Sequence, residues 1–404
     1  MVRAGAILAS LAGVACSGLL DVASPSRVPA STLDSPQLAG MLVRSAIGDF
    51  ECVFGNYVAT SALVTDEFSA SSASAQTGLD RRIPNLDQSG GCAQLSSTAA
   101  AATWVGLATA RYQADDTFVR LANEPQTDSM PRWRATLAAY AGYAYTIIGE
   151  GYCTAAFDDG PELQPLQVLQ IASQRFDSAI ALAQAPGNSD ILNFARVGHA
   201  RVLLDLGMLP EAAAEAKLVS PNFRRDATYS SDSPRRQNQV WVWNGGVAWA
   251  TVDARFRNLT VGGVADPRVS VIDAGKNGPG GKRLWLANRY SSDASPIPIA
   301  TWEEAQLIVG EAEGGQSAVA VVNALRSKAG LPATFASTDP VAIRDTLREE
   351  RRRQLFLQGH RLNDMLRFLI PFDTGINAYG QTYSTMTCFP LPRVETDNNP
   401  NIQR

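Results

Sequence analysis

Residues 343–370 read IRDTLREERRRQLFLQGHRLNDMLRFLI and predict two consecutive helices. Asp339 can cap the first helix, and Pro340 suits its first position because an N–H there would have no helical partner. Apolar residues recur every four positions up to Gly359, and the same stripe passes through Arg351. We therefore expect the first helix to run to Gly359 and to carry the Arg351 guanidinium toward its packed side.

The charged residues of this stretch predict a network of ion pairs. A guanidinium on a packed face needs an acidic partner, and Glu349 and Glu350 are the nearest candidates for Arg351. A second charged set follows at three-residue spacing on the next helix: Arg361, Asp364 and Arg367. We expect Pro371 to end that helix. Because acids offset the arginines at 351–353 and the chain has a net charge of −4, an ion network is favoured over a nucleic-acid site.

Four stretches in the last quarter of the chain, taken in order, carry a family resemblance. They are the glutamate-rich segment 303–312, the segment 322–332 with its Ala-Gly-Leu turn, the Gly-His-Arg and Asp-Met-Leu-Arg groups of 359–367, and the closing segment 389–401 with FPLPRVE and NPN. In this arrangement the chain resembles the SusD/RagB-like nutrient-binding lipoproteins of bacterial outer membranes. The resemblance implies a mainly α-helical, SusD-like platform of degenerate tetratricopeptide-like repeats, which captures a nutrient for a SusC-like, TonB-dependent transporter.

The composition is that of a packed globular protein. The 404 residues are 45% hydrophobic, while charged residues make up 18% and aromatic residues 8%. With abundant alanine and glycine, these values favour closely packed helices over a twisted sheet. We expect residues 36–404 to form a single SusD-like domain.

The amino terminus has the pattern of an export signal. Residues 1–15 contain one basic residue, Arg3, and an apolar run too short to span a bilayer. Because small residues precede Cys16, we expect Cys16 to be lipidated and residues 16–35, rich in Ser, Pro and Ala, to form a tether. The alternative is a plain signal peptide before an ordinary cysteine. A lipidated chain would be anchored in the outer membrane, with the cell surface as the favoured side.

Four further cysteines form an even set: Cys52, Cys92, Cys153 and Cys388. In an oxidising compartment they can form disulfides, and three pairings are possible. The alternative for each is a buried free thiol. The sequence does not choose among the pairings.

Helical periodicity extends over most of the chain. Val43, Ile47, Phe50 and Phe54 share one face of an amino-terminal helix. Further helices are expected at about 94–122, 131–150, 166–184, 189–206 and 210–219. The last two resemble one tetratricopeptide unit, and because a single unit cannot bury its own faces, neighbouring helices must complete a solenoid.

This periodicity stops between residues 220 and 300. The region is rich in Gly, Pro, Asn and Asp, and short alternating runs such as 239–243 predict strands. A long irregular, partly β, insertion in a helical scaffold commonly carries function. We therefore place the binding region here.

Candidate ligand contacts lie in the same region. Tryptophan rings can stack on the apolar faces of sugars, and amide side chains can bond to sugar hydroxyls. The candidates are Trp241, Trp243, Trp249, Trp285, Asn244 and Asn288. The alternative for each tryptophan is a place in the core or between strands.

Motifs of covalent or metal chemistry are not evident. The glycine-rich run 275–283 lacks the first glycine and the final Ser or Thr of a phosphate loop, so it predicts a turn. His199 and His360 are expected to be structural. The acids Asp158 and Asp159 are too few for a calcium loop. We expect no catalytic residue, metal or cofactor.

Three hypotheses for function follow. The resemblance implies binding and hand-over without covalent chemistry, with an oligosaccharide or polysaccharide as the ligand and a peptide as the alternative. The second hypothesis is a periplasm-facing helical-repeat adaptor that binds another protein through its solenoid groove. The third is a glycoside hydrolase, which would need two acids about 5–10 Å apart across a cleft.

Overall fold

The computed structural model describes residues 36–72, 75–83, 102–124, 127–185 and 187–402. The expected signal peptide 1–15, the lipidation site Cys16 and the tether 16–35 lie outside these residues, as does Cys92. Within the described part of the chain, no helix is both long enough and apolar enough to cross a membrane.

Helices dominate the structure, which confirms the predicted fold class. The longer helices are α1 (Ala39–Val64), α3 (Ala102–Ala122), α4 (Met130–Gly151), α5 (Pro165–Leu182), α6 (Ser189–Asp205), α7 (Leu209–Lys217), α9 (Trp302–Glu313), α10 (Gly315–Lys328) and α11 (Pro340–Gln354). The shorter ones are α2 (Ala75–Asp80), α8 (Gln239–Trp241), α12 (Arg361–Arg367) and α13 (Arg393–Asn398). Single 3-10 turns occur at Pro36–Leu38, Pro234–Arg236, Ala254–Phe256 and Pro267–Val269.

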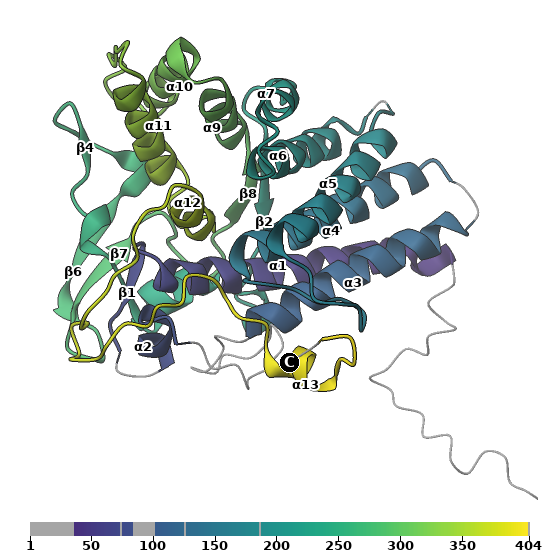
Figure 1. The fold of residues 1–404 in the computed structure, drawn as a ribbon, viewed down its shortest axis with the longest axis horizontal. Helices are drawn as coiled ribbons and strands as arrows, with labels where there is room; N and C mark the ends of the chain where they lie inside the picture. Colours follow the sequence, from purple (N-terminus) through teal and green to yellow (C-terminus); the bar gives the residue numbers. More distant parts are fainter. Residues whose placement is uncertain (1–35, 73–74, 84–101, 125–126, 186, 403–404) are drawn as a thin grey trace, which may run out of the picture.

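The longer helices stack side by side, largely in chain order, as a solenoid (Figure 1). α3 packs against α1 and α4, and α4 contacts α5 and α6. α7 joins the two halves of the solenoid because it packs against both α6 and α9, and α10 lies against α9 and α11. Stacking of this kind buries the faces that a single tetratricopeptide-like pair would leave exposed.

Glycine permits the closest helix contacts in the first half. A Cβ atom at Gly198 on α6 would lie 2.3 Å from Phe176 Cζ on α5, and one at Gly142 on α4 would lie 2.8 Å from the same ring. Tyr143 and Phe194 complete the cluster with ring centroids 4.5 Å apart. The Phe176 ring therefore fits between α4 and α6 because two facing positions lack a side chain.

Strands are short and form antiparallel pairs, most of them within the irregular region. The pairs are β1 (Phe68–Ala70) with β3 (Ala250–Val252), β2 (Arg224–Ala227) with β8 (Ile297–Thr301), β4 (Thr260–Val261) with β5 (Val264–Ala265), and β6 (Val271–Asn277) with β7 (Arg283–Ala287). Within the glycine-rich run 275–283, residues 278–282 connect β6 to β7, and the rest of the run belongs to these two strands. The insertion is thus partly β, as expected.

The prediction of a strand at 239–243 is wrong. Residues 239–241 form the helical turn α8, and a π-helical turn (Val242–Gly246) follows directly. The Asn238 side chain accepts a hydrogen bond from the Trp241 N–H and so caps the turn. This local cap and the two glycines at 245–246 decide the conformation, because the alternating apolar pattern alone fits either structure.

The two helices predicted around residues 343–370 are α11 and α12. α11 begins as predicted, but both helices end earlier than predicted. The Asp339 carboxylate caps α11 by accepting two backbone N–H groups. α11 stops before Gly359 because Leu357 and Gly359 have φ values of 55° and 84°, which are left-handed. α12 likewise ends at Arg367, short of Pro371.

The ion network is present, but the predicted partner of Arg351 is wrong. Arg351 Nε donates to Asp364 on α12 over 2.8 Å and not to either preceding glutamate. Glu350 is fully buried and instead accepts from Arg268 over 2.7 Å and from Arg326 over 2.5 Å. The other charged residues of α12 also have partners: Arg361 with Asp66, and Arg367 with Glu311 and Asp205. Arg351 and the charged residues of α12 therefore form ion pairs within the protein.

One of the open cysteine pairings is defined. Cys153, after α4, forms a disulfide with Cys388, near the carboxyl terminus. Cys52 on α1 is also disulfide-bonded, and its partner lies outside the described residues.

Candidate functional site

The π-helical turn positions the first candidate tryptophan. Trp241 is partly exposed, and its indole lies against the backbone of the turn. A Cβ atom at Gly245 would be 2.8 Å from Trp241 Nε1, and one at Gly246 would be 3.2 Å from Cζ3 of the same ring. Glycine is thus needed at 245 for the ring to take this place. Single π-turns occur frequently at functional sites.

Asn244 joins the turn to the neighbouring strands. Its Nδ2 donates to the carbonyl oxygens of Ala250 (3.0 Å) and Trp285 (2.9 Å), and its Oδ1 accepts from the Ala287 N–H (2.8 Å). Asn244 is 2% exposed and Trp243 is 4% exposed. These two residues therefore hold the candidate region together from the inside.

The other four candidates lie nearer the surface. Trp241, Trp249 and Trp285 are partly buried against the core, and Asn288 is exposed. The Arg257 guanidinium lies 4.8 Å from the centre of the Trp285 ring, which fixes that ring by a cation–π contact. Through Asn244 the structure brings the π-turn of Trp241 beside the strand of Trp285.

A polar groove was not predicted from the sequence. It has a volume of about 510 Å³ and lies between α1 and residues 228–236. Its charged lining residues are Arg44, Glu51, Arg235 and Arg236. Burial raises the pKa of Glu51, although the Thr228 hydroxyl donates to this carboxylate over 2.8 Å. Arg44 and Glu51, which lie about two turns apart on α1, were the available signal.

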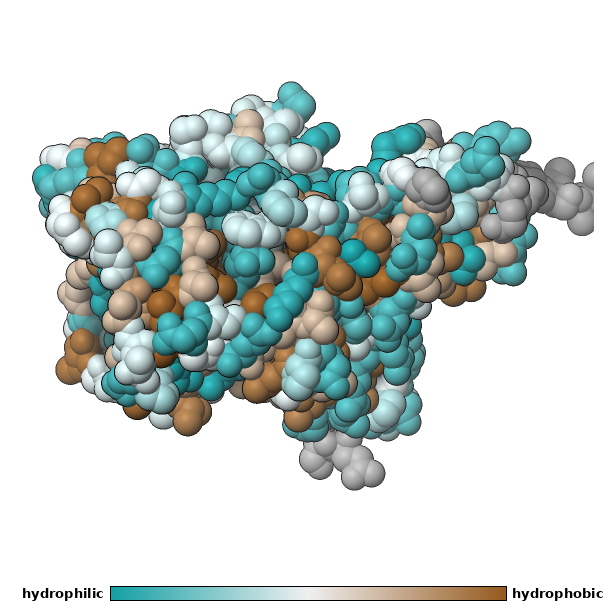
Figure 2. Space-filling view, turned by 90° about the horizontal axis from the view of Figure 1, so that it is seen from above, coloured by the Kyte–Doolittle hydropathy of each residue, from teal (hydrophilic) through white to brown (hydrophobic). Residues whose placement is uncertain are grey.

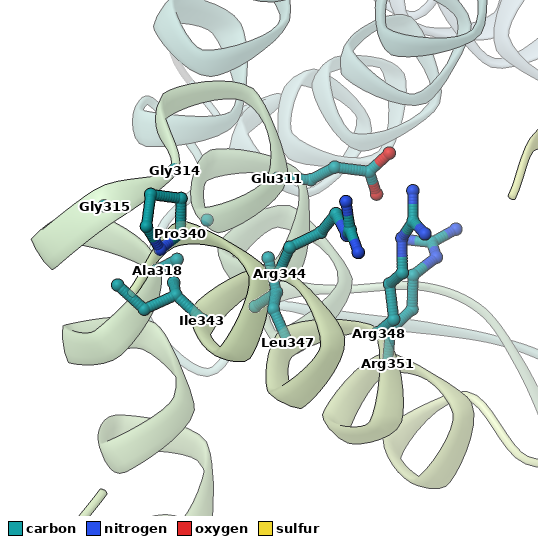
Figure 3. Close-up of a pocket in the computed structure, with 11 residues that line it drawn as sticks. Glu311, Gly314, Gly315, Ala318, Pro340, Ile343, Arg344, Leu347, Arg348 and Arg351 are labelled. Carbon is teal, nitrogen blue, oxygen red and sulfur yellow. The ribbon is translucent and has the colours of Figure 1, made fainter. Parts of the chain in front are cut away.

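A second cavity, of about 270 Å³, lies among α9, α10 and α11. Figure 3 shows its two ends: Ala318, Pro340 and Ile343 lie at one, and the side chains of Glu311, Arg344, Arg348 and Arg351 gather at the other. The cavity is therefore apolar at one end and cationic at the other.

The two histidines are placed in structural surroundings. His199 Nε2 lies 3.1 Å from the Ser173 hydroxyl oxygen. His360 is 2% exposed, and burial, with nearby arginines, lowers its pKa well below the usual value. Burial also raises the pKa of Glu304, 3.9 Å from His360, to about 7. His360 and Glu304 therefore belong to a buried polar network that joins α9 to the start of α12.

Asp158, the first of the two adjacent acids considered for calcium, pairs with an arginine. Asp158 accepts two hydrogen bonds from Arg111, each of 2.6 Å, and these bonds lower its pKa. Among the residues that the structure describes, no cluster of three His, Cys, Asp or Glu side chains could hold a metal ion.

Comparison with known proteins agrees with this architecture. Residues 304–404 match the model of the SusD family. The carboxyl-terminal quarter of the chain is similar to the SusD family. Apart from Glu303, this match covers the four stretches from which the sequence resemblance was drawn. No curated protein sequence matches the chain.

Solved structures extend the likeness of this SusD-like chain beyond its last quarter. A SusD-like carbohydrate binding protein from Bacteroides vulgatus ATCC 8482 is 14% identical, with a TM-score of 0.69 over 90% of this chain and 96% of that one. A SusD superfamily protein from Bacteroides fragilis is 12% identical, with a TM-score of 0.67 over 92% and 99%. Surface glycan-binding protein A from Bacteroides thetaiotaomicron is 13% identical, with a TM-score of 0.65 over 91% and 98%. At these identities the likeness establishes the fold.

The SusD-like chain thus presents three separate features on one helical platform. The face in Figure 2 mixes hydrophilic and hydrophobic side chains over its surface. The tryptophan region offers flat aromatic surface, the groove beside α1 offers charged and hydroxyl groups, and the cavity at α11 offers arginines beside hydrocarbon. Each suits a different ligand chemistry.

Proposed function

We propose that this SusD-like protein captures an oligosaccharide or polysaccharide at the outer membrane and hands it to a TonB-dependent transporter without covalent chemistry. The observation that carries the proposal is the likeness over nine-tenths of the chain to structures named as carbohydrate or glycan binding proteins. The partly exposed tryptophans of the irregular region support it, because such rings can stack on sugars.

Within the candidate region, we assign different roles to the six residues named from the sequence. Trp241, Trp249 and Trp285 are the proposed stacking surfaces, and Asn288 is a proposed partner for sugar hydroxyls. The inner pair, Trp243 and Asn244, positions them. This division follows from exposure, since a residue that is nearly fully buried offers no surface to a ligand.

The proposal includes anchoring of the protein at the membrane. A lipid on Cys16 would hold the protein at the membrane, and the tether 16–35 would let the helical platform reach a barrel beside it. The transporter partner and the cell-surface side follow from the family resemblance.

We expect alanine at Trp241 or Trp285 to weaken glycan binding at least about tenfold, which is about 1.4 kcal/mol. The loss of a flat ring removes stacking area, while the hydrogen bond from the Asn244 side chain to the carbonyl oxygen of residue 285 remains. The measurement is a glycan array with the full mature chain, followed by titration calorimetry on the best ligand. Trp133→Ala on α4 is the matched control, because it removes an indole outside the irregular region.

Three results would count against glycan capture at this site. The first is the absence of any glycan that binds. The second is binding by the Trp241 and Trp285 variants that equals binding by the Trp133→Ala control. The third is hydrolysis of the bound glycan. The last would favour the glycoside hydrolase.

We expect a TonB-dependent barrel to co-purify with the tagged protein from its native outer membrane in comparable amount. Quantitative mass spectrometry of the purified material makes the measurement, and Cys16→Ser, which removes the lipid, should lower the recovery. Recovery of periplasmic or envelope-assembly proteins instead would reject transport capture and favour the adaptor.

A further inference from the structure

We propose that the cavity among α9, α10 and α11 binds an organic carboxylate with a small aliphatic body. Its charged group would meet Arg348 and Arg351, and its hydrocarbon would lie against Ala318, Ile343 and Leu347 (Figure 3). The proposal concerns a different part of the molecule from the tryptophan region, and it does not depend on glycan capture.

Arg351 has a buried hydrogen-bond donor without a partner. Arg351 is 3% exposed, and its Nε donates to Asp364 over 2.8 Å. Its Nη1, however, has no hydrogen-bond partner, although the residue lines the cavity. A buried guanidinium N–H that lacks an acceptor costs free energy, so an acceptor in the cavity would stabilise the protein.

Positive charge exceeds negative charge at the cationic end of the cavity. The acids nearby already have partners: Glu311 with Arg367, Asp364 with Arg351, and Asp345 with Arg344. Arg348 forms no ion pair with any described residue, and its guanidinium lies 4.2 Å from the centre of the Phe368 ring. Planar guanidinium groups suit carboxylates because the two oxygens can accept paired N–H groups.

The lining of the cavity favours a hydrocarbon ligand over a sugar. The residues that line this cavity are glycine, alanine, proline, isoleucine, leucine, arginine and one glutamate. The apolar end, formed by Ala318, Pro340 and Ile343, has no side chain that could bond to sugar hydroxyls, and no residue of the lining has an aromatic ring for stacking. At about 270 Å³ the cavity is smaller than most drug-sized sites, so the ligand has few carbon atoms.

Two sources share this chemistry: a free branched-chain acid, and the carboxyl-terminal residue of a peptide with an aliphatic side chain. Isocaproate represents the first and N-acetyl-L-leucine the second. Calorimetric titration of each into the full mature chain distinguishes the two sources by relative affinity. N-acetyl-L-leucinamide lacks the charge and acetate lacks the aliphatic body, so both should bind at least about tenfold more weakly than the better acid.

Variants locate the site. We expect Arg348→Gln to weaken the better acid about tenfold or more, because a hydrogen bond to a charged group is lost. Ala318→Leu should abolish binding because the larger side chain fills the apolar end of the cavity. This second variant still tests the proposal if Arg348→Gln folds poorly. Lys276→Gln, which removes an exposed charge from β6, is the matched control and should leave the affinity unchanged.

The proposal would be overturned by any of several results. One is the absence of saturable binding by both acids, and another is binding of the amide or of acetate as tight as that of the better acid. Binding that survives both Arg348→Gln and Ala318→Leu would also place the carboxylate elsewhere.

Discussion

We expect Arg201→Leu to lower the free energy of unfolding by about 3–5 kcal/mol. Arg201 on α6 is 4% exposed, and its Nε donates to the buried Glu150 carboxylate on α4 over 2.6 Å. Its Nη1 also lies 3.8 Å from buried Glu304 on α9. Removal of the guanidinium leaves both carboxylates without this cation, which is why the cost is large. Urea unfolding followed by circular dichroism measures it.

The size of this effect should depend on pH. Burial raises the pKa of Glu304 from 4.5 to about 7, while Arg201 acts to lower it. A carboxyl with a raised folded-state pKa contributes its full stability below the unfolded value and loses it as the pH rises through the folded value. Without Arg201 the Glu304 pKa rises further, so the variant should lose more stability near pH 8 than near pH 5.

An exposed arginine provides the control for this prediction. Arg132 pairs with Asp190 over 2.7 Å, with side-chain exposures of 40% and 45%. Arg132→Leu should therefore change the stability by only about 0–1 kcal/mol. If Arg201→Leu costs no more than this near pH 8, the buried network does not stabilise the fold as we describe.

Helix positions were the most predictable part of the fold. The segment expected at 131–150 is α4, Met130–Gly151, and the one expected at 166–184 is α5, Pro165–Leu182. These helices have long stripes of apolar residues, so the pattern alone locates them. The early end of α11 was not visible, because it depends on a contact distant in sequence: the Leu357 N–H donates to Glu67 over 2.7 Å.

The ion partners illustrate the same limit. The sequence shows that Arg351 lies on a packed face and needs an acid, which the structure bears out. The sequence favoured two glutamates on the same helix as its partners, but the partner is Asp364 on the next helix. Which acid is nearest depends on how two helices cross, and a one-dimensional spacing does not contain that angle.

The irregular region was predictable from the sequence, but the exposure of its individual residues was not. The loss of helical periodicity marks residues 220–300 correctly. Exposure within the region depends on tertiary packing: Trp241 and Trp243 are two residues apart, yet only the first is partly exposed. The groove beside α1 was missed because its walls are far apart in sequence.

We expect the double variant Cys153→Ser/Cys388→Ser to lose about 2–5 kcal/mol of unfolding free energy. The disulfide joins residues separated by 235 positions, so it restricts the unfolded chain strongly. In the folded chain the carboxyl-terminal segment is also held beside it, because the Cys153 N–H donates to Phe389 O over 2.9 Å and the Phe389 N–H donates to Gly151 O over 2.8 Å. These bonds remain in the variant, so it should fold with the same secondary structure and a lower urea midpoint.

A non-reducing peptide map verifies the pairing in the parent protein, and Thr387→Ser, a similar change at an exposed neighbour, should leave the midpoint unchanged. A double variant with the parent midpoint and slope would show that this cross-link does not restrict the unfolded chain.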